Sequence, residues 1–72
     1  MNIQQPNNQW IEIEATLEQI QRTNQIIAFH KGFSQPDLNA LENFNALRLD
    51  FLKQLAILLQ EYKIEIMLPA SA

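Results

Sequence analysis

The feature that most constrains this chain is a long stretch, residues 37–62, whose apolar side chains repeat with the period of an α-helix. Wound at 100° per residue, the stretch places these side chains within an arc of about 140°. An arc that wide is broader than the contact line between two helices, so we expect this helix to touch at least two neighbours. The residues in the arc are Ala40, Leu41, Phe44, Leu47, Phe51, Leu52, Leu55, Leu58, Leu59 and Tyr62.

A second helical pattern lies upstream, over residues 9–31. Its apolar positions follow the three–four spacing of a helix packed along another helix, and they are Trp10, Ile13, Leu17, Ile20, Asn24 and Ile27. Asn24 interrupts this seam. At a core position it is expected to set the register by demanding a hydrogen-bond partner, and the alternative is a partly exposed edge position. A weaker patch of Ile11, Ala15, Ile26 and Phe29, with Arg22 inside it, is expected to be half covered by a neighbour.

The link between the two patterns carries helix-ending and helix-starting signals. Gly32 can adopt the left-handed conformation that ends a helix, with Phe33 folding back as the apolar contact of a Schellman motif. Ser34 can cap the next helix, with Pro36 in its first turn and Asp37 at the capping-box position. Two helices joined by so short a link are expected to lie antiparallel.

The predicted fold is therefore all-α. It is an antiparallel αα-hairpin over residues 9–63, with helices at about 9–31 and 35–63, that dimerises into a four-helix bundle. Residues 1–8 are expected to form a flexible arm, and residues 64–72 an extended tail whose 64–68 portion packs across the open end of the bundle. Both 9–14 and 63–68 alternate like strands, which leaves a small two-stranded ribbon as an alternative.

Arg48 is the polar residue that stands out, because it lies in the middle of the apolar arc. A guanidinium there must reach solvent, pair with a carboxylate or lie at an interface. Pairing across the turn places Arg48 opposite Glu18 or Ile20, so Glu18 or Glu14 is a candidate partner. If two hairpins pack with their second helices antiparallel, Arg48 also falls near the two-fold axis.

Composition excludes several classes of protein. Five basic and eight acidic residues give a formal net charge of −3 without any basic cluster, which argues against nucleic-acid binding. The longest apolar run, residues 55–59, is far shorter than the ~20 residues needed to span a membrane. The chain has no cysteine and no secretion signal at its N-terminus, so we expect a soluble cytoplasmic protein without membrane association.

Catalytic chemistry is not expected from these residues. The single histidine, His30, fits the last turn of a helix better than a catalytic or metal-binding role, and no second histidine lies at ligand spacing. Glu12, Glu14 and Glu18 are interpreted as a solvated acidic group in the first half of a helix rather than as a cation site. One glycine excludes a glycine-rich phosphate loop. We predict no catalytic residues, no metal and no cofactor.

The segment 27–40, IAFHKGFSQPDLNA, followed by LKQL at 52–55 and LLQEY at 58–62, resembles small cyanobacterial helical-hairpin proteins of uncharacterised function. The resemblance covers the hairpin and neither terminus. It implies a cytoplasmic bacterial protein with an interaction role, and it brings no catalytic or binding residues.

The sequence favours a small non-enzymatic interaction or adaptor protein that acts as a homodimeric bundle. The predicted interface is formed by Phe44, Arg48, Phe51, Leu52, Leu55, Leu59 and Tyr62, with Asn24 as the polar residue that sets the register. The alternatives are a heteromeric or chaperone-like subunit that uses the same face for another protein, and an anion or small-molecule site around Arg48. The residues do not reveal the identity of a partner.

Overall fold

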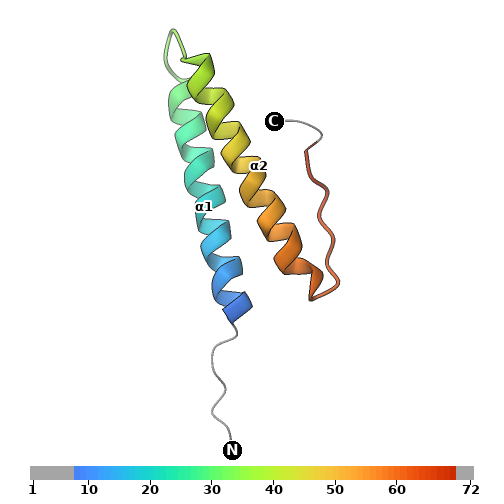
Figure 1. Cartoon of the computed structure of the whole chain (residues 1–72). Coiled ribbons are helices and arrows are strands. Elements are labelled where there is room, and N and C mark those ends of the chain that lie inside the picture. The colour runs from blue at the N-terminus through green and yellow to red at the C-terminus, as the bar shows by residue number, and fades with distance from the viewer. Residues whose placement is uncertain (1–7, 70–72) are drawn as a thin grey trace, which may run out of the picture.

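The computed structural model describes residues 8–69, which form two antiparallel helices joined by a short link (Figure 1). Helix α1 spans Asn8–Lys31 and helix α2 spans Leu38–Gln60. The two helices pack against each other, which confirms the predicted all-α hairpin. Residues 9–14 belong to α1 and residues 64–69 have no regular structure, so the ribbon alternative is wrong. Most of the predicted arm, residues 1–7, and the last three tail positions, 70–72, lie outside the described residues.

Helix α2 begins three residues later than the predicted start at 35, because Asp37 and not Ser34 is its N-cap. The Asp37 backbone is extended, with φ −78° and ψ 104°, and its Oδ1 accepts a hydrogen bond of 3.1 Å from the Ala40 backbone N–H. Pro36 explains the later start. A proline disfavours the helical conformation in the residue before it, so Gln35 cannot easily be helical.

The predicted left-handed Gly32 is also wrong, since no described glycine has a positive φ. The Gly32 N–H donates to the carbonyls of Ala28 at 3.2 Å and Phe29 at 3.1 Å, so Gly32 prolongs the hydrogen bonding of α1 by one residue. The Phe33 N–H donates to the His30 carbonyl at 3.3 Å. Phe33 packs its ring on the rings of Phe29 and His30.

Within residues 8–69, the left-handed residue is Lys63, which has φ 57°. Just before it, α2 ends at Gln60, short of the predicted end at 63. The Ile64 N–H donates to the Leu59 carbonyl at 3.2 Å and the Lys63 N–H donates to the Gln60 carbonyl at 2.9 Å. These two bonds are those of a Schellman motif, so this helix end has the reversal that glycine usually provides, with a lysine in its place.

The seam of α1 is displaced from the predicted one. Ile27, Thr16 and Thr23 are its buried residues, and Thr23, at 3% exposure, is the most buried of them. Each threonine hydroxyl donates to the carbonyl four residues earlier, at 2.7 Å, and so leaves its methyl group for packing. The seam is formed by Ile13, Thr16, Ile20, Thr23, Ile27 and His30. The predicted seam shares its three isoleucines, but Trp10 and Leu17 are exposed.

After Lys63 the chain turns back and runs beside α2, where Figure 1 shows it as the orange-red segment. Ile66 and Leu68 are half-buried, whereas Glu65, Met67 and Pro69 are exposed, as expected for an extended segment with one side against a helix. The segment is extended as predicted, but it follows the flank of α2 and does not cross the open end of the hairpin.

Replacing Lys63 with glycine is expected to raise the free energy of unfolding by about 0.5–1 kcal/mol. The reason is that a side chain with a Cβ is disfavoured in the left-handed conformation, and glycine removes this cost while losing some unfolded-state entropy. The measurement is urea unfolding followed by circular dichroism.

Lys63→Ala is the matched control, because it removes the same charge and keeps the Cβ. It should give no gain in stability. Equal stability of the glycine and alanine variants would contradict a left-handed Lys63 in solution.

Candidate interaction surface

The hairpin does not enclose a core. Among the described residues, Ile27 and Leu55 are the only buried hydrophobic side chains, each at 7% exposure, and no large side chain falls below 2%. Many large apolar side chains remain exposed instead. They are Trp10, Ile11, Leu17, Ile26, Phe29, Phe33, Leu38, Leu47, Ile57, Ile64 and Met67. An exposed apolar surface of this extent marks a candidate interaction surface.

Two contacts between the helices fix their register. The Trp10 and Tyr62 rings lie 5.4 Å apart near the open end, and Arg48 Nε donates a hydrogen bond of 2.6 Å to Asn24 Oδ1 near the middle. Both pairs are centred on residue 36, so residues equally far from position 36 lie at the same height in the hairpin. Asn24 and Arg48, the two polar residues that interrupt the predicted seams, are thus hydrogen-bonded to each other.

The expected pairing of Arg48 with Glu18 or Glu14 is wrong. It followed from placing Arg48 opposite Glu18 or Ile20, which centres the turn at residue 33 or 34, whereas the later start of α2 moves the centre to residue 36. Asn24 therefore takes the position expected for Glu18 or Ile20. Glu18 lies 4.0 Å from Arg22 instead, one helical turn away, with both side chains mostly exposed. An exposed pair of this kind contributes little to stability.

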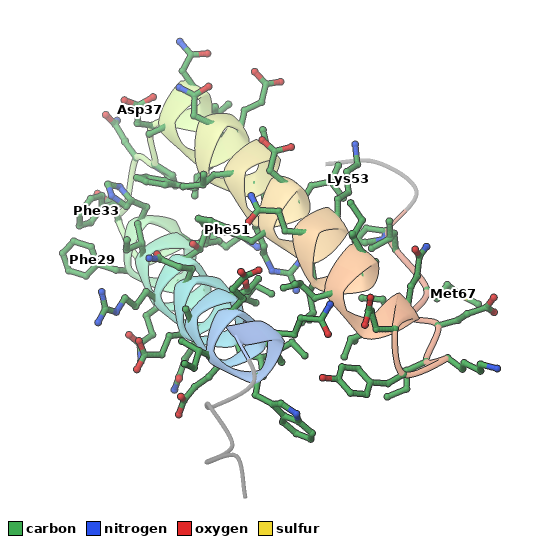
Figure 2. The ribbon with its side chains drawn as sticks, turned by 60° about the horizontal axis from the view of Figure 1, so that its bottom comes forward. Phe29, Phe33, Asp37, Phe51, Lys53 and Met67 are labelled. Atoms are coloured by element: carbon green, nitrogen blue, oxygen red, sulfur yellow. The ribbon has the colours of Figure 1, made fainter. Side chains whose placement is uncertain are left out.

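At the turn end, the hairpin is closed by an aromatic cluster of Phe29, His30, Phe33 and Phe44. The His30 ring lies 5.2 Å from the Phe44 ring of α2 and 5.4 Å from the Phe33 ring. Its Nδ1 is buried and has no hydrogen-bond partner in the structure. The half-buried His30 therefore connects α1 and the turn to α2 through ring contacts, and Figure 2 shows Phe29 and Phe33 beside each other at the turn end.

The structure places the seven predicted interface residues within the hairpin. Leu55 is buried and the other six are half-buried. Phe51 points into the space between the helices (Figure 2), and Phe44 and Tyr62 contact rings of α1. Leu52 and Leu59 are half-buried residues of α2. The most exposed apolar side chains are therefore different residues from those predicted.

A groove runs between the helices, and we name the surface around it the groove face. Near the open end it is lined by Glu12, Ala15, Thr16, Gln54, Ile57 and Leu58, with a volume of about 430 Å³. Thr16 forms part of its floor and Ile57, at 64% exposure, forms part of its rim. The groove is mainly apolar because the Thr16 hydroxyl is turned toward its own helix.

A second apolar surface lies on α1 away from this groove. It is lined by Trp10, Ile11, Ile13, Glu14 and Leu17. Trp10 and Leu17 were expected in the seam with α2, and the displacement of the seam toward Thr16 and Thr23 leaves them exposed.

The acidic residues Glu12, Glu14 and Glu18 do not form a cation site. No group of three or more histidine, cysteine, aspartate or glutamate side chains within residues 8–69 could hold a metal ion. In the same part of the chain, neither helix has the length and hydropathy to cross a bilayer.

Comparison with protein-family models, with curated proteins and with solved structures gives no match for this chain. The resemblance to cyanobacterial hairpin proteins stays a prediction.

The Asn24–Arg48 hydrogen bond is expected to show a coupling of about 1 kcal/mol in a double-mutant cycle built from Asn24→Ala and Arg48→Met. Methionine keeps most of the aliphatic length of the arginine, so the cycle isolates the polar contact. The measurement is the free energy of urea unfolding of the four proteins.

A parallel cycle with Glu18→Ala and Arg22→Ala serves as the control. This exposed pair, at 4.0 Å, should couple by less than about 0.5 kcal/mol. Equal coupling in the two cycles would show that the Asn24–Arg48 bond does not hold the register.

Proposed function

We propose that this chain is a small non-enzymatic protein-interaction subunit, which acts as a homodimer of hairpins packed into a four-helix bundle. The observation that carries the proposal is the contrast in burial between the two sides of each helix. Among residues 8–69, only Ile27 and Leu55 are buried apolar residues, while Ile57 and Phe29 are exposed by 64% and 66%. A bundle of four helices has an interior that a pair of helices lacks, so a second copy supplies the missing cover.

The size of the hairpin supports the same conclusion. A chain this short buries a small fraction of its unfolded surface, and a single core of this size gives only about 3–5 kcal/mol of net stability. Neither a disulfide nor a thiolate metal site can add to this stability, because the sequence has no cysteine. Association is the remaining common route to a stable fold.

The chemistry of the described side chains favours interaction over catalysis. His30 packs among phenylalanine rings, and its Nδ1 is buried away from solvent. The exposed carboxylates of Glu12 and Glu14 each line an open apolar surface whose other lining residues carry no titratable group, so neither has the second group that general acid–base catalysis uses.

The second apolar surface supports an adaptor role. Trp10, Ile11 and Leu17 are each at least half exposed and lie on α1 away from the groove face. A dimer formed through one surface keeps this other surface for a different protein. A heteromeric or chaperone-like subunit is the competing hypothesis, in which a different protein covers the groove face.

Size-exclusion chromatography with light scattering tests the proposal. At micromolar concentration we expect a mass of twice the 8.4 kDa chain, together with high helicity by circular dichroism. A well-folded species of 8.4 kDa that persists at all accessible concentrations would refute the homodimer. A poorly folded monomer would favour the heteromeric subunit.

A further inference from the structure

The heptad period extends the groove face from the open end toward the turn. Residues seven apart on a helix lie on one side of it, so Ala15 of the groove is followed by Arg22 and Phe29 on α1. On α2, Ile57 is followed in the same way by Asp50 and Asn43. All six residues are exposed and form the two outer rims of the groove face. The inner rows are Gln19 and Ile26 on α1 and Gln54 and Leu47 on α2, which are exposed as well.

At four successive heights the two sides of this face carry side chains of the same kind, apolar, amide or charged, whereas nearest the turn Phe29 is level with the polar Asn43. Since the hairpin is centred on residue 36, Ala15 is level with Ile57, and Arg22 is level with Asp50. Ile26 and Leu47 are level within one residue, as are Gln19 and Gln54. From the open end toward the turn, both helices therefore present an apolar residue, an amide, a charged residue and another apolar residue. On α1 these are Ala15, Gln19, Arg22 and Ile26, and on α2 they are Ile57, Gln54, Asp50 and Leu47. The two charges are of opposite sign.

Such a pattern is self-complementary under one particular symmetry. A two-fold axis that lies in the interface and runs parallel to the helices keeps every residue at its height and places α1 of one copy on α2 of the other. Arg22 of each copy then meets Asp50 of the second copy, Ala15 meets Ile57, and Ile26 meets Leu47. Each contact occurs twice, as two-fold symmetry requires.

The other face-to-face arrangement does not pair Arg22 with Asp50. A two-fold axis across the helices, through the middle of the hairpin, places α1 on α1 and α2 on α2. Arg22 then lies near Arg22 of the second copy and Asp50 lies near its Asp50, so like charges face each other. Charge complementarity thus selects the axis parallel to the helices.

Three further observations are consistent with a groove face that is free to bind a second copy. The segment 64–69 runs beside α2 (Figure 1), and none of its residues lines the groove. The ion pair of Arg22 within its own chain is the long, exposed one with Glu18, so Arg22 can turn to a second partner. Two helices of this length present a face of about 35 by 20 Å, or roughly 700 Å². Stable interfaces bury about 600–1,000 Å² on each partner, and the face falls within this range.

We infer that a second copy of this chain covers the groove face across a two-fold axis parallel to the helices, with Arg22 of each copy paired to Asp50 of the other. This inference rests on the proposed homodimer and specifies its surface and symmetry. Both turns lie at the same end of the resulting bundle, and every helix is antiparallel to its two nearest neighbours. The Arg48–Asn24 pair then fixes the register within each hairpin, while Arg22 and Asp50 fix the pairing between hairpins.

Charge reversal in the full chain tests the inference. Arg22→Glu alone and Asp50→Arg alone each turn two attractive contacts into two repulsive ones, and each should raise the dimer dissociation constant at least about tenfold. The variant with both changes restores opposite charges across the interface and should recover most of the affinity. The measurement is sedimentation equilibrium, with circular dichroism to confirm that each variant is helical.

Two controls separate the specific contact from net charge. Lys53→Glu changes the net charge as Arg22→Glu does, and Glu42→Arg changes it as Asp50→Arg does, at exposed sites off the groove face. Both should leave the dissociation constant within about twofold, since exposed charges outside an interface contribute little.

Single reversals that leave a stable dimer unchanged, or a double variant no tighter than either single one, would overturn the inferred symmetry while keeping the homodimer. A wild-type chain that is monomeric at every concentration would overturn the homodimer itself. The two failures are therefore distinguishable in one set of experiments.

Discussion

Two helices have a single line of contact between them, and this limit governs the structure of the whole chain. Along that line the hairpin buries Thr16, Thr23, Ile27 and Leu55, and these side chains account for its buried residues among the positions described. The wide apolar arc of α2 extends beyond this line on both sides. On one flank the segment 64–69 runs beside it, and on the other the groove face stays open. The apolar excess of α2 is thus the reason to expect a second molecule.

The position of the turn determines which residues meet. Because Pro36 keeps the preceding residue out of the helix and Asp37 caps α2, the hairpin is centred on residue 36. This centre brings Asn24 to Arg48, so the exposed Asn24, beside the seam of α1, accepts a hydrogen bond from the half-buried Arg48. The same centre makes Arg22 level with Asp50 on the open side. The start of α2 at the Asp37 cap therefore determines both the register within the hairpin and the charge pattern on the groove face.

The sequence was sufficient for the two helices and their antiparallel packing, because apolar periodicity is a local signal. It did not specify the turn, because Ser34 and Asp37 are both good caps and the choice depends on the effect of Pro36 on Gln35. Thr16 and Thr23 were not predicted as seam residues, because hydropathy counts a threonine as polar. In the structure both hydroxyls are hydrogen-bonded within α1. Their seven-residue spacing, continued by His30, was the signal that could have identified them. Arg22 and Asp50 are level only when the hairpin is centred on residue 36. Their charge match could therefore not be predicted before the register was known.

The central claim is that the hairpin is completed by a second copy of itself, and the concentration dependence of unfolding tests it most directly. Urea unfolding followed by circular dichroism, over a hundredfold range of protein concentration, measures whether folding and association are linked. The account predicts that the midpoint rises with concentration, because each tenfold increase adds about 1.4 kcal/mol to the apparent stability of a dimer that unfolds to two chains. A cooperative transition whose midpoint is the same at every concentration would show that the hairpin is stable alone and would contradict the account.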